Sequence, residues 1–185
     1  MVKTVALKLA IPGAVGVLPT DTLYGLVARA SDQAAVERLY RLKHREQKPG
    51  TLIAASIDQL VALGIKRRYL TAVSQYWPGA VSVVIPCGEE LSYLHQEQHS
   101  LAVRIPADAD LRTLLEETGP LITSSANLPG QPPAVTVAEA HAYFANLVDF
   151  YEDGGDLSGR QASTVIRIAD DAVEVLRAGA VAIDV

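Results

Sequence analysis

Hydrophobic positions recur along the chain at two spacings, one typical of strands and one typical of helices. The apolar run 14–18 ends at a proline, which is typical of a buried strand that leads into a loop. Val36, Leu39 and Tyr40 then recur at the spacing of one helix face. The preceding Asp32 is the expected N-cap of that helix. Strand and helix patterns therefore alternate from the start of the chain.

The same pattern continues to the C-terminal end. Further strands are expected at 51–55, 81–85, 102–105, 120–123, 163–168 and 173–177. Helices are expected at 57–63 (capped by Ser56), 69–76, 110–117 and 137–147. Polar loops are expected at 89–100 and 124–133. Helices between most strands, with two adjacent strands at the end, predict an α/β fold with a mixed twisted sheet and flanking helices. Because no repeat or long linker interrupts the pattern, we expect one domain over residues 1–185.

Length and composition favour a globular cytoplasmic protein. The chain has 185 residues, of which 49% are hydrophobic, enough for one core. It contains no apolar run of about 18 residues that would span a membrane, and residues 1–9 lack the pattern of a signal peptide. With Cys87 as the only cysteine, no intramolecular disulfide is expected, which fits a reducing cytosol. The net charge of −5 argues against a protein whose main task is to grip a phosphate backbone.

A basic segment follows the first predicted helix. Lys43 continues the apolar stripe, so its ammonium group is expected to point inward or to the edge of a cleft. A cation there, with no obvious carboxylate on the same helix face, favours an anionic ligand such as a triphosphate. The alternative is a lysine that reaches solvent at the helix end, with Arg45 and Lys48 complementing the helix C-terminus. The local pattern leaves both interpretations open.

Two segments carry short polar side chains where a strand ends. Segment 123–130 has three consecutive hydroxyl residues followed by an alanine and Asn127, and such a loop can hold phosphate or carboxylate. An ordinary N-cap and turn has the same composition. Residues 20–25 lie where open α/β sheets place their ligand crevice. There the alternative is a hydroxyl turn before a helix.

Three more polar residues lie on or next to predicted strands. Arg104 interrupts an apolar strand, and arginine is rarely buried without a partner. Its guanidinium group is expected either to pair with an internal carboxylate or to receive the carboxylate of a ligand. Ser163 begins one of the last two strands and Arg177 ends the other, so a hairpin would bring them to the same region. Each of them alone is equally well explained as an exposed strand end.

Metal and common nucleotide motifs are not evident. His44, His95, His99 and His141 do not show the spacing of metal ligands, and the sequence has no glycine-rich motif of the P-loop or dinucleotide-binding type. We therefore expect no metal held by the protein itself.

Taken in order, these segments resemble the YrdC-like family along nearly the whole chain. The matching stretches are Leu18–Leu26, Lys43–Arg45, Trp77–Gly79, Ala102–Pro106, Ser125–Leu128, Ser163–Val165 and Leu176–Ala180. The resemblance implies an α/β twist fold with a concave, positively lined cleft. It also implies synthesis of threonylcarbamoyl-adenylate from L-threonine, bicarbonate and ATP, with release of pyrophosphate, for threonylcarbamoyladenosine modification of tRNA.

The resemblance assigns the nucleotide side of the cleft to five residues. Lys43 and Arg45 match a Lys-x-Arg pair that suits the ATP phosphates. Ser125 and Asn127 match a Ser-x-Asn element at the nucleotide and reaction centre. Arg177 matches an arginine on the nucleotide side. ATP is implied as a substrate that brings its own magnesium.

The resemblance assigns the amino-acid side to Thr20, Arg104 and Ser163, which match positions that hold threonine. The Arg104 guanidinium is a natural partner for the threonine carboxylate. The implied partners are L-threonine, bicarbonate, ATP and a tRNA-modifying transferase complex that receives the intermediate, with at most a weak contact to tRNA. No general base for the threonine amine is evident.

The chain departs from the family pattern at two places, and two other functions compete with synthesis. Glu46 stands where the family usually has proline, and Pro129-Gly130 replaces Ser-Gly. Glu46 is expected to weaken the field felt by a phosphate. One alternative is a YrdC-like paralogue that binds RNA or a nucleotide without making the adenylate. A purely structural interaction domain would need a patterned exposed surface, which the sequence lacks.

Overall fold

The computed structural model describes residues 2–44, 47–170 and 172–183, which contain nine strands and seven α-helices. The strands are β1 (Gly16–Pro19), β2 (Tyr24–Arg29), β3 (Thr51–Ile53), β4 (Val81–Pro86), β5 (Ser100–Arg104), β6 (Leu121–Ser125), β7 (Phe150–Tyr151), β8 (Thr164–Ala169) and β9 (Ala172–Arg177). The α-helices are α1 (Val2–Leu9), α2 (Gln33–Leu42), α3 (Ile57–Leu63), α4 (Arg67–Ala72), α5 (Ser92–His95), α6 (Ala109–Thr118) and α7 (Val137–Phe144). Short 3₁₀ helices cover η1 (Ser74–Tyr76), η2 (Glu89–Leu91) and η3 (Ala145–Leu147).

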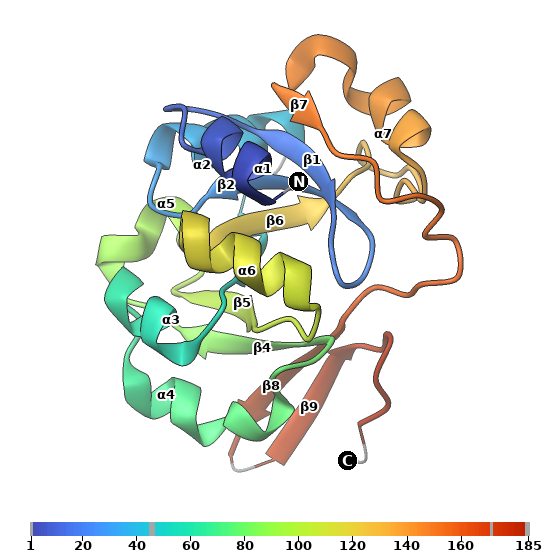
Figure 1. Ribbon diagram of the computed structural model, residues 1–185. Helices are drawn as coiled ribbons and strands as arrows, with labels where there is room; N and C mark the ends of the chain where they lie inside the picture. The colour runs from blue at the N-terminus through green and yellow to red at the C-terminus, as the bar shows by residue number, and fades with distance from the viewer. Residues whose placement is uncertain (1, 45–46, 171, 184–185) are drawn as a thin grey trace.

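All nine strands form one mixed sheet in the order β7-β1-β2-β6-β3-β5-β4-β8-β9 (Figure 1). The pairs β1–β7, β3–β5 and β4–β8 are parallel, and the other five pairs are antiparallel. The expected mixed sheet with flanking helices is therefore confirmed. The last two strands form the expected hairpin at one edge of the sheet.

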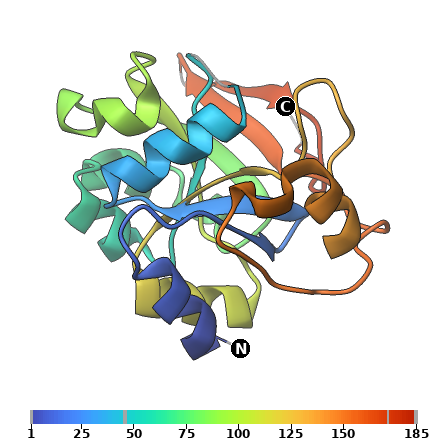
Figure 2. The same ribbon diagram turned by 90° about the horizontal axis from the view of Figure 1, so that it is seen from above.

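Helices cover both faces of the sheet, because successive side chains of a strand point to opposite faces. Leu26 and Leu52 belong to the larger core, whereas their neighbours Val27 and Ile53 belong to the smaller one. Helices α1 and α6 pack on the face of the smaller core, and α2 and α5 lie on the opposite side of the sheet (Figure 2). Central strands buried on both faces read as continuous apolar runs.

Two predicted helix starts are confirmed by their capping bonds. The side chain of Asp32 accepts a hydrogen bond from the N–H of Ala35, and that of Ser56 accepts one from Gln59. Asp32 also accepts from the N–H of Gly13 at 2.7 Å, so one carboxylate joins the helix start to the turn before β1. These caps were predictable because they depend on neighbours within three residues.

Several elements differ from the sequence-based expectation. Strand β2 was missed, because the segment that precedes it was interpreted as a turn before a helix, whereas it is the turn of a β-hairpin. The loop expected at 89–100 contains η2 and α5, held by the buried side chains of Leu91 and Leu94. The expected helices 69–76 and 137–147 each break into an α-helix and a 3₁₀ turn. Helix α1 and the two-residue strand β7 were also not predicted.

The Asp32 cap makes a testable contribution to stability. Burial alone would raise the pKa of Asp32, but the hydrogen bonds from Gly13 and Ala35 lower it below 3.8. Asp32→Ala should reduce the free energy of unfolding by about 0.5–2 kcal/mol near neutral pH. Because the folded-state pKa lies below the unfolded one, the contribution of the charge is lost as the pH falls through the folded pKa, and the two proteins should then converge.

Urea unfolding at neutral pH and at about pH 3 measures this convergence. Gln33→Ala, an exposed neighbour on the same helix, is the control and should change stability by less than about 0.5 kcal/mol. A difference between wild type and Asp32→Ala that is constant with pH would show that the charge of Asp32 contributes nothing.

Candidate functional site

A cavity of about 250 Å³ lies beside the β1–β2 turn, where several central strands end. It is lined by Thr20, Thr22, Leu23, Tyr24, Gly25, Pro49, Gly50, Thr51, Ala102, Arg104, Thr123, Ser124, Ser125, Ala162, Ser163, Val165 and Arg177. We call it the strand-end cavity. Five of the residues assigned by resemblance line it, namely Thr20, Arg104, Ser125, Ser163 and Arg177. They come from segments far apart in the sequence, so only the folded sheet brings them together.

A buried ion pair lies at this cavity. Arg104, at the end of β5, donates from Nη2 to Oδ1 of Asp21 at 2.9 Å, and the two side chains are 4% and 7% exposed. The internal carboxylate expected as one option for Arg104 is therefore present. Removing one member of such a pair would leave an uncompensated buried charge.

The ion pair continues into a chain of hydrogen bonds. Nη1 of Arg104 donates to Oγ of Ser82 at 3.2 Å, and Ser82 Oγ lies 2.9 Å from Ser163 Oγ. Arg177 Nη2 donates to the hydroxyl of Ser163 at 3.1 Å and to its carbonyl at 2.8 Å. The expected proximity of Ser163 and Arg177 is thus confirmed. This chain of hydrogen bonds joins Arg104 and Ser163, which the resemblance places on the amino-acid side, to Arg177 on the nucleotide side.

Three buried polar atoms at this site have no hydrogen-bond partner among the described residues. They are Oδ2 of Asp21, Nε of Arg104 and Oγ of Ser124. Buried polar groups in folded proteins nearly always have partners, and exceptions need an explanation. Arg104 and Ser124 both line the cavity, so a polar ligand there would supply the missing bonds.

Lys43 lies at the C-terminal end of α2 and turns inward, as its place on the apolar stripe predicted. Its ammonium donates to the carbonyls of Ser125 and Asn127 at 2.7 and 2.6 Å and to Oδ1 of Asn127 at 2.6 Å. Ser125 Oγ also donates to Oδ1 of Asn127 at 2.7 Å. Lys43 is therefore only 4% exposed and fixes the loop after β6. The alternative, a lysine that reaches solvent at the helix end, is therefore wrong.

The loop after β6 accommodates the departure from the family pattern. Gln131 N donates to the carbonyl of Leu128 at 3.1 Å, and Gly130 has φ +76°. Proline followed by a glycine of positive φ is the signature of a type II turn. Pro129-Gly130 therefore closes this turn by local backbone chemistry.

Arg45 and Glu46 lie outside the described residues, so their predicted roles stay predictions.

The β1–β2 turn is held on several sides. Thr20 Oγ1 donates to the carbonyl of Leu23 at 2.7 Å, so a hydroxyl does close this turn, but it leads into a strand and not into the helix of the alternative interpretation. Burial raises the pKa of Tyr24, so its hydroxyl stays protonated; it donates to the Gly155 carbonyl and accepts from Gly154 N. A Cβ atom on Gly25 would lie 2.6 Å from Thr123 Oγ1, so only glycine fits there.

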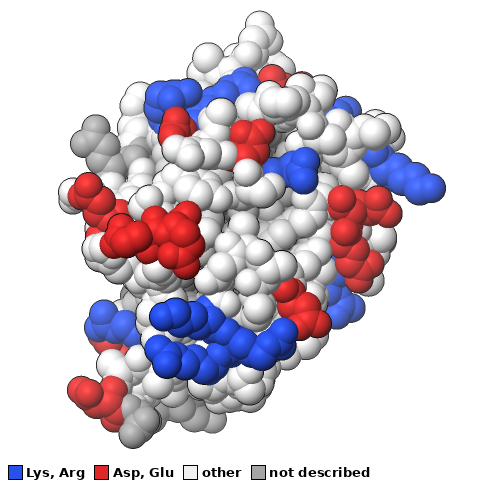
Figure 3. Space-filling model, turned by 90° about the vertical axis from the view of Figure 1, so that its left-hand side faces the viewer, with Lys and Arg blue, Asp and Glu red and all other residues white. Residues whose placement is uncertain are grey.

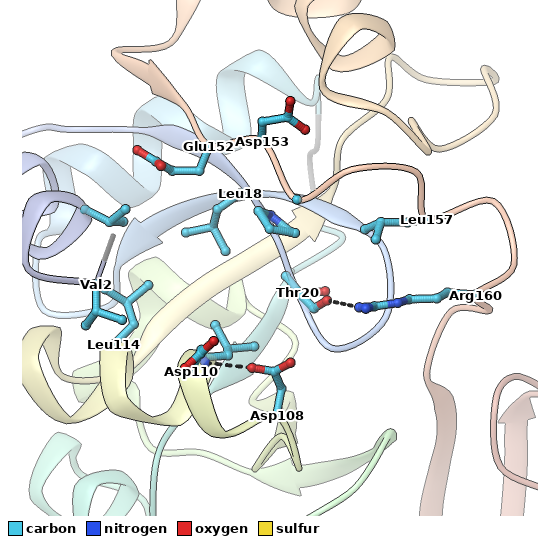
Figure 4. Close-up of a pocket in the computed structure, with 14 residues that line it drawn as sticks. Val2, Leu18, Thr20, Asp108, Asp110, Leu114, Glu152, Asp153, Leu157 and Arg160 are labelled. Atoms are coloured by element: carbon cyan, nitrogen blue, oxygen red, sulfur yellow. Dashed lines mark hydrogen bonds between the residues drawn. The ribbon is translucent and has the colours of Figure 1, made fainter.

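A second cavity, of about 230 Å³, lies behind Thr20 (Figure 4). Its walls combine the apolar side chains of Val2, Val5, Leu18, Leu111, Leu114 and Leu157 with Asp108, Asp110, Glu152, Asp153 and Arg160. Four carboxylates and one guanidinium disfavour an anionic ligand there. Thr20 borders both cavities, and its carbonyl accepts from Arg160 at 2.9 Å. Of the two, the strand-end cavity suits a phosphate or carboxylate ligand.

Sequence reasoning missed Asp21 and Ser82 as site residues. Asp21 stands inside the quoted Thr20-Asp21-Thr22 motif, yet its partner is 83 positions away. Ser82 appeared as one polar position in an apolar strand, and it is fully buried beside Arg104. The usable signal was the arginine in an apolar strand, which required a buried partner.

In residues 2–44, 47–170 and 172–183, no group of three or more His, Cys, Asp and Glu side chains could hold a metal ion. No helix in these ranges is long and apolar enough to span a membrane.

Fold and site together define a class: a mixed α/β sheet with a polar, arginine-bearing ligand cavity at its strand ends. The family model Sua5_yciO_yrdC, described as "Telomere recombination", matches residues 10–179. The chain therefore belongs to the Sua5/YciO/YrdC family, as its sequence motifs indicated.

Named relatives and solved structures agree with this membership. The threonylcarbamoyl-AMP synthase of Klebsiella pneumoniae subsp. pneumoniae is 37% identical over 158 residues, which cover 82% of each chain. P. abyssi Sua5 complexed with L-threonine has a TM-score of 0.84 and 29% identity, covering 96% of this chain and 54% of Sua5. E. coli YciO, at 24% identity and TM-score 0.80, shares the fold over 97% of this chain and 90% of its own. The chain thus spans about half of P. abyssi Sua5.

The Lys43 contacts predict that this residue supports the fold as well as the cavity. Lys43→Met keeps most of the side-chain volume but leaves three oxygen acceptors without their ammonium donor. The free energy of unfolding should fall by about 1–3 kcal/mol or more. Urea unfolding measures it, with exposed Arg41→Met on the same helix as the control. Equal stability of the two variants would contradict the structural role of Lys43.

Proposed function

We propose that this protein is an L-threonylcarbamoyladenylate synthase, a nucleotidyltransferase that condenses L-threonine, bicarbonate and ATP. The products are threonylcarbamoyl-AMP and pyrophosphate, and the adenylate serves threonylcarbamoyladenosine modification of tRNA. The observation that carries the proposal is the meeting of Thr20, Arg104, Ser125, Ser163 and Arg177 at one cavity.

The cavity is lined by side chains that suit the two larger substrates. Thr20, Arg104 and Ser163 offer hydroxyls and a guanidinium, which fit the polar groups of threonine. Ser125 also lines the cavity and contacts the side-chain amide of Asn127, which Lys43 holds. Lys43 and Arg177 supply positive charge for the phosphates of ATP, to which Arg45 is predicted to contribute.

The reaction needs positioning and charge stabilisation more than covalent help from the protein. The threonine nitrogen bonds to the carbon of bicarbonate, and water and a proton leave to give a carbamate. A carbamate oxygen then bonds to the α-phosphorus of ATP as the bond to pyrophosphate breaks. Holding three reactants in one cavity removes much of the entropic barrier. Cations near the phosphates, with the magnesium that ATP brings, offset the charge that develops on the leaving group.

The relatives support this assignment. The Klebsiella pneumoniae protein named threonylcarbamoyl-AMP synthase matches 82% of the chain, and P. abyssi Sua5 was solved with L-threonine. These names and ligands belong to the relatives. Five of the residues that the sequence resemblance assigns line one cavity in this chain, which supports the same substrates here.

The competing function is a paralogue that binds RNA or a nucleotide without synthesis. On the face that carries α3, α4 and α5, basic side chains form several separate groups, the largest in the lower part of the view, with acidic groups between them (Figure 3). Such a group fits a weak contact with tRNA or with the transferase complex that takes the adenylate, whereas tight RNA binding needs more extended positive charge. No observation favours this function over synthesis.

Pyrophosphate release gives the direct test of the proposed reaction. The purified protein should release pyrophosphate from ATP only when L-threonine, bicarbonate and magnesium are all present, because the carbamate is the nucleophile. Coupled pyrophosphate detection and mass spectrometry of the adenylate measure it. ATP turnover without threonine, or none under any condition, would contradict the assignment and favour the paralogue.

A crossed pair of variants tests the assignment of Arg104 to threonine and of Arg177 to ATP. Arg104→Lys keeps the charge but loses the planar fork, so threonine affinity should fall by roughly 1.5–3 kcal/mol while ATP affinity changes little. Arg177→Lys should show the reverse pattern. Calorimetric titrations with each ligand, and thermal melts of each variant, separate the effects. Equal loss of both ligands in both variants would refute the division of the cavity.

A further inference from the structure

The second cavity, behind Thr20, has no role in the proposed reaction and differs in chemistry from the strand-end cavity (Figure 4). We propose that it is a docking site for a partner protein, which inserts the side chain of a lysine or an arginine into it. The aliphatic stem of that side chain packs on the leucines of the cavity, and its cationic head meets the carboxylates. The docking site itself does not depend on the proposed reaction.

The buried residues that line this cavity form an aliphatic floor. They are Val5 of α1, Leu18 of β1, Leu111 and Leu114 of α6, and Leu157, and each of them is only 3–5% exposed. Such a floor offers dispersion contacts and removal of apolar surface from water, but no hydrogen bonds. It therefore favours an apolar stem over a polar ligand.

The rim of the cavity carries an excess of negative charge from two segments. Asp108 and Asp110 lie at the start of α6, and Glu152 and Asp153 follow β7. Figure 4 shows the two acidic pairs on opposite sides of the floor. Arg160 is the one lysine or arginine among the described residues that line the cavity. A cation is therefore attracted to this rim, and an anion is repelled.

Most of these carboxylates keep their charge available to a ligand. Asp110 is exposed and has no ion pair or hydrogen bond among the described residues. Asp108 and Asp153 each accept through Oδ1 from a backbone N–H, that of Leu111 and that of Gly155, both at 2.8 Å. A backbone N–H carries no net charge, so these two carboxylates are not neutralised by their contacts.

The rim already pairs with one ammonium group of the chain itself. Lys8 of α1 donates to Oε1 of Glu152 at 2.7 Å, and its ammonium lies 5.3 Å from the centroid of the Phe150 ring. The same combination of a carboxylate and an apolar surface is what we propose for the side chain of the partner. Because Glu152 is already paired, the incoming cation is expected at Asp108 and Asp110.

A basic side chain of a protein fits these features better than a free polyamine does. Lysine has an uninterrupted methylene stem with its charge at the tip, and neutral backbone amides at the other end. Spermidine carries a charged nitrogen within its chain, which would lie on the leucine floor without a partner. The chemistry therefore favours a basic segment of a partner protein.

Thr20 places this docking site next to the proposed reaction. It lines both cavities, and its carbonyl accepts from Arg160. The proposed product is a mixed anhydride of a carbamate and AMP, which water hydrolyses. An enzyme that receives this product and binds behind Thr20 would shorten the path of the product through water. This choice of partner, unlike the docking site, rests on the proposed function.

The test compares capped peptides that differ in one side chain. Acetyl-Ala-Lys-Ala-amide carries the cation, norleucine in place of lysine keeps an apolar stem without the charge, and glutamate reverses the charge. In NMR titrations without ATP or threonine, the lysine peptide should shift the amide signals of Leu111, Leu114 and Leu157. It should bind about tenfold or more tightly than the norleucine peptide, and the glutamate peptide should not bind. Equal affinity of the lysine and norleucine peptides would overturn the docking site.

A variant then assigns the preference to the rim. Asp110→Asn removes a carboxylate that has no partner in the described chain, so the affinity for the lysine peptide should fall toward that for the norleucine peptide. Glu116→Gln, at an exposed position of α6 outside the cavity, is the matched control and should keep the wild-type preference. Thermal melts establish that both variants are folded.

Further arms of the experiment separate other occupants and the proposed function. Tighter binding of spermidine than of the lysine peptide would overturn the protein partner in favour of a free amine. Asp110→Asn should release pyrophosphate at the wild-type rate, because Asp110 does not line the strand-end cavity. A chain that releases pyrophosphate but does not prefer the lysine peptide would overturn the docking site alone. A chain that prefers the lysine peptide but makes no adenylate would overturn the proposed function alone.

Discussion

A guanidinium group buried at the end of a central strand requires a negatively charged partner, and this requirement determines how the site is arranged. Arg104 is 3% exposed and pairs with Asp21, so the β1–β2 turn has to lie against β5. Arg160 donates to the carbonyl of Thr20 in this turn, and the hydroxyl of Tyr24 accepts from Gly154 N. Both bonds hold the turn against segment 152–160. On its other side Arg104 reaches Ser82 and, through Ser163, the C-terminal hairpin. One charged side chain thus ties three distant parts of the chain to one cavity.

Residues that we propose for ligand binding also stabilise the fold beside this cavity. Lys43 orders the loop after β6 by donating to its oxygens, and its positive charge is proposed to act on a phosphate. Breaking the Arg104–Asp21 pair would leave a buried charge without compensation, a loss that commonly amounts to about 3–5 kcal/mol. Because variants at such residues are expected to change folding and binding together, the ligand affinity of each variant must be compared with its thermal stability. Chemically conservative changes and altered ligands separate the two effects better than alanine substitutions do.

The sequence predicted what depends on near neighbours and on simple periodicity. The caps of α2 and α3, the strands from β3 to β6 and the terminal hairpin follow from local pattern, and the arginine in an apolar strand correctly indicated a buried partner. The partner itself was not predictable, because Asp21 meets Arg104 only through the order of strands in the sheet. Strand β2 was missed because its first residues are typical of a turn, and α5 because core packing of Leu94 overrides a polar sequence. Lys43 was placed correctly, but its oxygen partners come from a loop more than 80 positions away.

The central claim is that the strand-end cavity holds the amino acid at Arg104 and the nucleotide beside Ser125 and Arg177. A crystal structure of the protein with L-threonine and a non-hydrolysable ATP analogue tests it most directly. We predict the threonine carboxylate within hydrogen-bond distance of the Arg104 guanidinium, and the phosphates near Arg177 and the loop after β6. Threonine bound in the cavity behind Thr20, or phosphates bound at Arg104, would contradict it.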